Sequence, residues 1–283
     1  MKYAIGLSSC GKEVNEKLFC DYQKNGITKM EISERYYENF DFKETKRLSQ
    51  KYGVELWSLH LPFYPEGMLD ISCTAELVRK YTIAKYKELI VKGAQIGIRI
   101  FVLHPSCGPI YNGEREQKIQ QAQKSLKELA EFADQYNAVI AVEDMCRVSL
   151  GNTSQEILRL LSADNRLKVC FDSNHLLQEK GDAFILAMGD RIITTHISDY
   201  DFVNERHWLP GEGKIDWKKI IAALEKVGYN GPWLYELGFE IPATILRERE
   251  LTCEDFARNA QEVLTGKKIT VLSKPKPNLG MWS

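Results

Sequence analysis

The stretch VCFDSNHLLQ, residues 169–178, indicates how the rest of the chain is built. Its first residues are an apolar run of the kind found in buried strands, which ends abruptly at Asp172. His175 follows three residues later and is one of five histidines in the chain. Polar side chains directly after a buried strand are typical of a site at the carboxyl edge of a parallel sheet.

Seven further apolar, β-branched runs predict strands, and longer segments of helical period lie between them. The eight predicted strands cover residues 3–9, 27–33, 54–60, 98–104, 138–144, 167–172, 191–198 and 231–237. The predicted helices cover residues 13–25, 41–52, 74–96, 114–137, 154–162, 178–189, 216–227 and 253–265. Eight strand–helix units close into a (β/α)8 TIM barrel, an α/β fold. An open doubly wound sheet is the alternative, but no GxGxxG follows the first strand.

The chain shows no internal repeat and no domain linker, so we predict a single barrel domain over residues 1–265 and a C-terminal tail over 266–283. The tail contains the stretch KPKPNLGMWS, which we expect to lack regular structure. Met281 and Trp282 in this tail could dock on another surface, and we expect the chain to form a homodimer with the tail as a contact.

The composition narrows the classes of partner. Lys and Arg number 38 against 39 Asp and Glu, a net charge of −1, so we expect no nucleic acid partner and no anionic membrane. No window approaches the roughly 18 apolar residues of a spanning helix. Seven scattered cysteines without a CxxC pair indicate reduced thiols and a cytoplasmic location.

Chemistry in such barrels lies at the carboxyl ends of the strands. All the histidines fall at these ends or in the loops that follow, as do three carboxylates: His60, His104, Glu143, Asp172, His175, His196, His207 and Glu236. Taken singly, a histidine here is commonly structural, and Asp172 could cap a helix. Asp199, in HISDYD, is expected to anchor its loop.

Glu143 and Glu236 are harder to explain separately, because each follows apolar residues, where an unpaired carboxylate carries a large desolvation cost. Carboxylates and imidazoles meeting at one mouth form a mixed O/N ligand set that suits Mn²⁺, Co²⁺, Zn²⁺ or Mg²⁺. We therefore predict a divalent metal site with Asp172 as a ligand. Glu31, at the end of the second strand, either reaches this pocket or pairs with Arg35 or a lysine.

Seven elements occur in order between residues 5 and 240: HLP, HPS, VED, FDSNH, HISD, RHWLPGEGKIDW and YEL. Together they resemble the xylose isomerase-like barrels, which include sugar epimerases of the tagatose 3-epimerase kind, hydroxypyruvate and inosose isomerases or dehydratases, and endonuclease IV. The resemblance implies one divalent metal ion held by Glu143, Asp172, His196 and Glu236. It also implies a substrate pocket lined by His60, His104, His175, Arg206 and His207. Trp208, in the same loop, is a candidate lid or stacking residue.

By the same resemblance, the metal grips the carbonyl and a neighbouring hydroxyl of a ketose, while Glu143 and Glu236 face opposite sides of the reacting carbon. One glutamate takes a proton next to the carbonyl, through an enediolate, and the other returns one. The expected activity is a sugar isomerase or epimerase. The expected substrate is a sugar or polyol, and a sugar phosphate or an inosose is an alternative substrate.

Two other functions stay open. Endonuclease IV holds three metals on similar strand ends, and Glu205, His207 and His104 could bind an additional metal here. The net charge of −1 argues against a basic protein surface that binds the phosphate groups of DNA. A barrel that binds a sugar without converting it is the third alternative.

Overall fold

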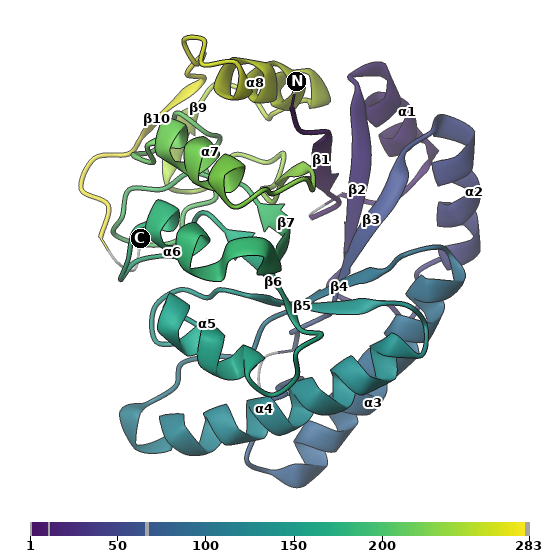
Figure 1. Ribbon diagram of the computed structural model, residues 1–283. Helices are drawn as coiled ribbons and strands as arrows, with labels where there is room; N and C mark the ends of the chain where they lie inside the picture. Colours follow the sequence, from purple (N-terminus) through teal and green to yellow (C-terminus); the bar gives the residue numbers. More distant parts are fainter. Residues whose placement is uncertain (1, 11, 66–67, 281–283) are drawn as a thin grey trace.

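Eight short parallel strands form the centre of the computed structural model, which describes residues 2–10, 12–65 and 68–280 (Figure 1). They are β1 (Ile5–Ser8), β2 (Ile27–Ser33), β3 (Glu55–His60), β4 (Ile100–Leu103), β5 (Val139–Glu143), β6 (Lys168–Asp172), β7 (Ile192–His196) and β8 (Trp233–Tyr235). The order in the sheet is β7-β6-β5-β4-β3-β2-β1-β8. A bridge between Ile197 and Tyr235 brings β7 beside β8. The predicted barrel is therefore confirmed.

Eight helices follow the strands and surround the barrel (Figure 1). They are α1 (Glu16–Lys24), α2 (Phe42–Tyr52), α3 (Glu76–Gln95), α4 (Asn112–Asp134), α5 (Ser154–Leu161), α6 (Gly181–Met188), α7 (Trp217–Lys226) and α8 (Cys253–Leu264). Each lies within a few residues of its predicted range. Among the described residues, no helix has the length and apolar character needed to cross a lipid bilayer.

The helix boundaries follow from side-chain capping. The Thr153 side chain accepts a hydrogen bond from the N–H of Glu156, and Asp216 accepts one from Lys219, so α5 and α7 begin at satisfied caps. Gly53 ends α2 with φ of 65°, a left-handed conformation that glycine adopts without steric cost.

The core has two layers because neighbouring strand residues point to opposite faces. Most buried side chains lie in the large cluster that joins the strands to the helices, including Leu103 and Val142. Val102, Ala141 and Cys170 form a separate cluster from three adjacent strands. We assign this small cluster to the barrel interior, where close packing leaves the polar side chains to collect at the carboxyl ends.

The expectation of an irregular tail is wrong in one place. A short strand, β10 (Ser273–Pro275), pairs antiparallel with β9 (Ile245–Arg247), which lies in the segment after β8. This pairing provides hydrogen-bond partners for backbone N–H and C=O groups that would otherwise be hydrogen-bonded only to water. Met281 and Trp282, which could dock on another surface, lie outside the described residues.

Candidate metal centre

The four predicted ligands meet at one point of the barrel mouth. Glu143, Asp172 and His196 are the last residues of β5, β6 and β7, and Glu236 directly follows β8. One ligand atom from each lies within 4.8 Å of the others. Parallel strands place their carboxyl ends on one rim, so residues far apart in the sequence converge.

His196 is the hub of this cluster. Its Nδ1 lies 3.0 Å from Oε1 of Glu143 and 3.2 Å from Oε2 of Glu236. Its Nε2 lies 3.0 Å from Oε1 of Glu31, and Oε2 of Glu31 accepts a hydrogen bond of 2.7 Å from Ser58. A carboxylate behind an imidazole fixes the orientation of the ring and raises its basicity, which is the usual arrangement around a metal-ligating histidine.

Glu31 is therefore a site residue that the sequence left undecided. It is fully buried on β2 between the apolar residues Met30 and Ile32, and it pairs with His196, so of the two alternatives it reaches the pocket. A carboxylate inside an apolar strand run was the signal that could have identified it, by the same reasoning that singled out Glu143.

Asp172 is hydrogen-bonded through only one of its two carboxylate oxygens, although the rings of His175 and His196 lie within 4.0 Å of the other. Its Oδ1 accepts a hydrogen bond of 2.6 Å from the N–H of Asn174, while its buried Oδ2 has no hydrogen-bond partner among the described residues. An orphaned carboxylate oxygen is costly to bury. A divalent cation in contact with this oxygen would remove that cost, so the donor set fits a metal ion.

The charges of the cluster also indicate a site for a cation. The pKa of Asp172 is raised to about 7, mainly by burial; His175 lowers it, and the neighbouring Glu143 and Glu236 add to the rise. Burial also acts on Glu143, but His196 and His104 hold its pKa well below the usual range. The carboxylates thus compete for a few imidazoles, and a cation would stabilise all of them together.

His60 and His104 lie beside Glu143, as expected for residues at the mouth. Nε2 of His60 lies 3.1 Å and Nε2 of His104 lies 3.4 Å from Oε2 of Glu143. These three residues form a second group with metal-binding geometry. The ring of Phe63 stacks on His104 with centroids 4.3 Å apart.

A third group lies around Glu205. Nε2 of His207 is 2.9 Å from Oε1 of Glu205, Nε2 of His175 is 3.7 Å from the same oxygen, and the Cys146 thiol donates to Oε2 at 3.0 Å. Cys146, His175 and Glu205 have metal-binding geometry, so Cys146 is a residue that sequence reasoning missed. The predicted partnership of His104 with Glu205 and His207 is not formed, because His104 belongs to the group around Glu143.

Arg206 and Trp208 do not have the positions expected of substrate contacts. The buried guanidinium of Arg206 pairs with Asp201 at 2.9 Å and donates to the carbonyl of Gly280, since a buried cation requires such partners. Trp208 is fully buried, and its indole N–H donates to Thr244 at 2.9 Å. Neither placement supports the expected role in a pocket or lid.

Asp199 anchors the loop after β7, as the sequence predicted. Its carboxylate accepts hydrogen bonds from the N–H groups of Gly211 and Ile215 and from the indole of Trp217. Its backbone exchanges two hydrogen bonds with Trp208. This double pairing fixes the path of the loop and turns the Trp208 side chain into the interior.

A pocket of about 570 Å³ opens at the carboxyl ends of β1, β2 and β3. We call it the mouth pocket; its lining includes Cys10, Glu34, Arg35, His60, Phe63 and Tyr64. His60, which lines this pocket, lies 3.1 Å from Glu143, so the mouth pocket borders the candidate metal centre.

Comparison with known proteins gives concordant results. The family model described as "Xylose isomerase-like TIM barrel" matches residues 21–253. An uncharacterized protein of Methanocaldococcus jannaschii is 25% identical over 228 residues, which cover 76% of this chain and 87% of that protein. A D-psicose 3-epimerase of Enterocloster bolteae is 24% identical over 264 residues, which cover 83% and 82%. The crystal structure of a D-tagatose 3-epimerase-like protein has the same fold, with a TM-score of 0.76 at 23% identity over 93% of this chain and 96% of that one.

Proposed function

Because this chain belongs to the xylose isomerase-like TIM barrel family, we propose that it is a divalent-metal-dependent sugar isomerase or epimerase. The observation that carries the proposal is the convergence of Glu143, Asp172, His196 and Glu236 within 4.8 Å at the barrel mouth. The likeness to a D-psicose 3-epimerase supports a small ketose or a related polyol as the substrate.

Glu143, Asp172, His196 and Glu236 would hold the ion, with Glu31 orienting His196. When bound, the ion would act as a Lewis acid that stabilises negative charge on the substrate oxygens, a contribution of several kcal/mol. The candidates are Mn²⁺, Co²⁺, Zn²⁺ and Mg²⁺, because carboxylate and imidazole donors suit each of them.

Glu143 and Glu236 would carry the acid–base chemistry. They approach the same His196 nitrogen from β5 and from the end of β8, which suits two carboxylates acting on one substrate carbon. One takes the proton next to the carbonyl, and the other returns a proton. Return to the same carbon gives an epimer, whereas return to the adjacent carbon gives an isomer. His60, His104, His175 and His207 lie around this cluster and would bind the substrate hydroxyls.

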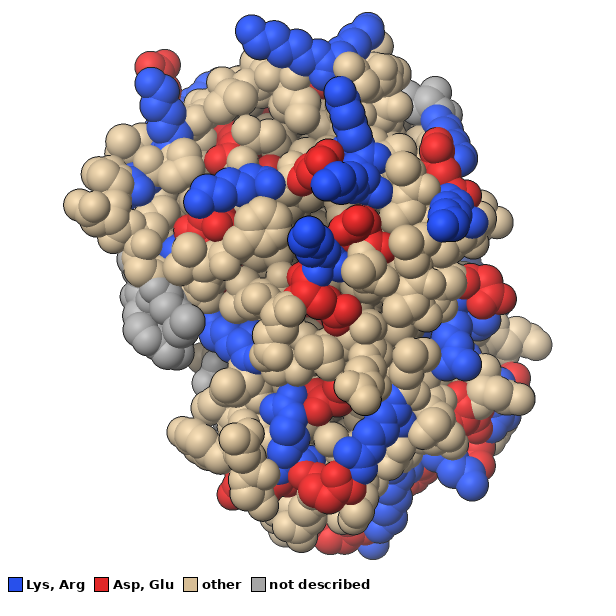
Figure 2. Space-filling model, turned by 60° about the vertical axis from the view of Figure 1, so that its left-hand side comes forward, with Lys and Arg blue, Asp and Glu red and all other residues tan. Residues whose placement is uncertain are grey.

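A second candidate function is metal-dependent cleavage of DNA at abasic sites, as in endonuclease IV. The groups His60–His104–Glu143 and Cys146–His175–Glu205, which adjoin the main cluster, favour it because they could hold additional metals. The net charge of −1 argues against it, and on the face drawn in Figure 2 Lys and Arg are interspersed with Asp and Glu.

The deciding experiment is metal analysis of the purified protein followed by incubation with a panel of ketoses in deuterated water. Entry of deuterium at the carbon next to the carbonyl, dependent on the metal, is the expected result. Cleavage of an abasic duplex without deuterium entry would replace the proposal by the second candidate. Metal-dependent sugar binding without exchange would identify a non-catalytic barrel.

We also propose that the protein works in a reducing compartment such as the cytoplasm, and that it assembles as a homodimer. All seven cysteines are thiols in the structure, which supports the reducing environment. Gel filtration with light scattering tests the assembly.

A further inference from the structure

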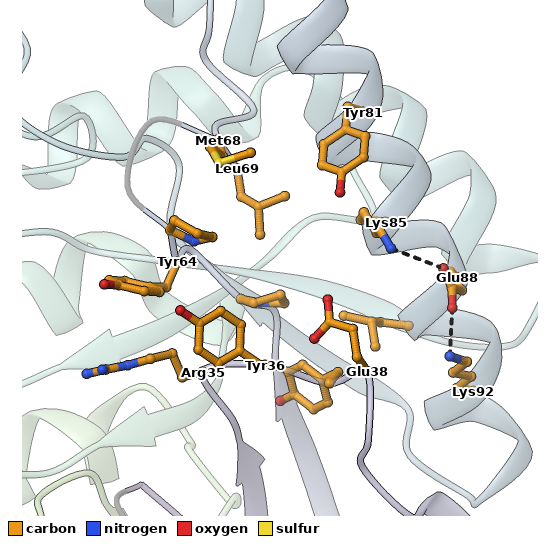
Figure 3. Close-up of a pocket in the computed structure, with 14 residues that line it drawn as sticks. Arg35, Tyr36, Glu38, Tyr64, Met68, Leu69, Tyr81, Lys85, Glu88 and Lys92 are labelled. Atoms are coloured by element: carbon orange, nitrogen blue, oxygen red, sulfur yellow. Dashed lines mark hydrogen bonds and ion pairs between the residues drawn. The ribbon is translucent and has the colours of Figure 1, made fainter.

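A second pocket adjoins the mouth pocket and has no part in the chemistry described above. It lies between the loop after β2, the loop after β3 and the outer side of α3 (Figure 3). We call it the outer pocket; its lining includes Arg35, Tyr36, Glu38, Tyr64, Tyr81 and Lys85. Its volume of about 270 Å³ suits one ring-sized group, because sites for whole ligands span about 300–1,000 Å³.

The two pockets share a wall made of Arg35, Pro62 and Tyr64. The Arg35 guanidinium lies over the Tyr64 ring at 4.8 Å, and Tyr36 meets the same ring edge-on with centroids 5.7 Å apart. On the inner side of this wall is His60, which contacts Glu143. A two-ring molecule placed from His60 past Tyr64 would therefore span both pockets.

The lining of the outer pocket combines exposed aromatic rings with polar groups. Tyr36 is 55% exposed and Tyr81 is 48% exposed, an unusual amount of aromatic surface for one small hollow. Figure 3 shows the Glu38 side chain rising into the cavity between these rings. Glu38 has no ion-pair partner among the described residues, whereas Glu88 across the pocket is paired with Lys92 at 2.6 Å.

Aromatic faces with a carboxylate in reach are what a sugar ring requires. The C–H faces of the ring pack on tyrosine, and its hydroxyl groups donate to a carboxylate that has no other partner. Arg35, Lys85 and Lys92 on the same lining donate hydrogen bonds, so the pocket offers both acceptors and donors to the hydroxyl groups of a ring.

We propose that the outer pocket is a subsite for a second sugar ring, so that the natural substrate is a glycosylated ketose with its reacting end in the mouth pocket. This inference rests on the proposed function of the metal centre. It assigns Tyr36, Glu38 and Tyr81 to the recognition of the distal ring, and it leaves proton transfer to Glu143 and Glu236.

The test compares two probes on the metal-loaded full chain. One is fructose, and the other is isomaltulose, in which a glucosyl ring is attached to the fructose carbon farthest from the reacting end. We expect kcat/KM for isomaltulose to exceed that for fructose. In Tyr36→Ala and Glu38→Ala this ratio should fall by about three- to tenfold each, the size of one aromatic or hydrogen-bond contact. Tyr111→Ala is the control, because Tyr111 is 70% exposed and lines neither pocket.

The outcomes separate the inference from the proposed function. If fructose reacts as well as isomaltulose and the ratio is unchanged in both variants, the subsite is refuted while the function stands. If neither sugar exchanges deuterium, the function fails, and calorimetry decides the subsite: isomaltulose binding no tighter than fructose binding overturns it. If Tyr36→Ala alters the dimer fraction but not the sugar preference, the outer pocket is an interface between two copies and the inference is wrong.

Discussion

The main-chain N–H of Asp172 donates a hydrogen bond of 2.8 Å to the carboxylate of Asp144. Asp144 follows Glu143 in the chain, so this bond ties the end of β6 to the end of β5, where two of the candidate ligands lie. The backbone carbonyl of Asp144 also lies 2.8 Å from Nδ1 of His175, which leaves Nε2 of that ring for Glu205. Asp144 therefore positions residues of two metal-binding groups.

Replacing Asp144 by alanine should weaken metal binding without removing a ligand. We expect the affinity for Mn²⁺ to fall about 10- to 100-fold, because groups that orient ligands typically contribute that much. Calorimetric titration of the metal-free protein measures it, with Asp190→Ala, at an exposed position, as the control. An unchanged affinity in Asp144→Ala would show that Asp172 keeps its place without this hydrogen bond.

Replacing either catalytic glutamate by glutamine should remove the activity while preserving the shape of the site. We expect kcat to fall about 10²- to 10⁴-fold in Glu143→Gln and in Glu236→Gln, the range for loss of a general acid or base. Glu240→Gln, at an exposed position nearby in the chain, should keep full activity. Deuterium incorporation into a reactive ketose is the measurement, and a variant that keeps more than about a tenth of kcat would exclude that glutamate from proton transfer.

The sequence predicts the fold well because each strand–helix unit is encoded locally. Apolar runs mark the strands, and within α4 the buried residues Ala122, Leu126 and Leu129 recur at helical spacing, a pattern visible in the sequence itself. The mouth residues are predictable for the same reason, since the end of each strand can be read from its own sequence.

The remaining features depend on contacts between distant segments. Glu31 reaches His196 only because β2 and β7 face each other across the barrel interior, a relation that no local pattern encodes. Cys146 joins Glu205 through the paths of two loops. Trp208 is turned inward by its backbone pairing with Asp199, so its position in the loop gave no guide to its side chain.

The loop after β7 should depend on Asp199 for its stability. Asp199→Ala would leave the N–H groups of Gly211 and Ile215 and the Trp217 indole without their acceptor. We expect a loss of about 3 kcal/mol in the free energy of unfolding. Urea unfolding measures it, and Asp216→Ala, which removes only the cap of α7, should cost about 1 kcal/mol. Equal losses in the two variants would contradict the anchoring role.

The free energy of unfolding should depend on pH through Glu34, which lines the mouth pocket. Burial, followed by the neighbouring Glu13, raises the pKa of Glu34 from 4.5 to about 7. The folded state therefore holds this proton more tightly than the unfolded state, so the free energy of unfolding should fall as the pH rises from 4.5 to 7. Because the side chain is partly exposed, we expect about 1 kcal/mol from this group.

Glu34→Gln isolates this contribution, because the metal centre titrates equally in both proteins. Urea unfolding at the two ends of that pH range should show a smaller decrease in the variant than in the parent chain. An identical decrease in both would mean that Glu34 titrates normally in the folded protein.

The effect of Asp172→Asn on stability should depend on whether the metal is bound. Without metal the variant should be more stable than the parent chain, and with metal it should lose most of the stabilisation that the ion provides. In the metal-free protein above pH 7, where Asp172 is ionised, Glu143, Asp172 and Glu236 crowd around one imidazole, so neutralising Asp172 relieves repulsion and should raise the free energy of unfolding by about 1 kcal/mol. With Mn²⁺ at a hundred times its dissociation constant, the parent chain should gain about 2.7 kcal/mol. The variant should gain much less, because it lacks a ligand charge. Urea unfolding in chelator and in Mn²⁺ tests both arms, with Asp190→Asn as the control; equal stabilisation of parent and variant by Mn²⁺ would remove Asp172 from the ligand set.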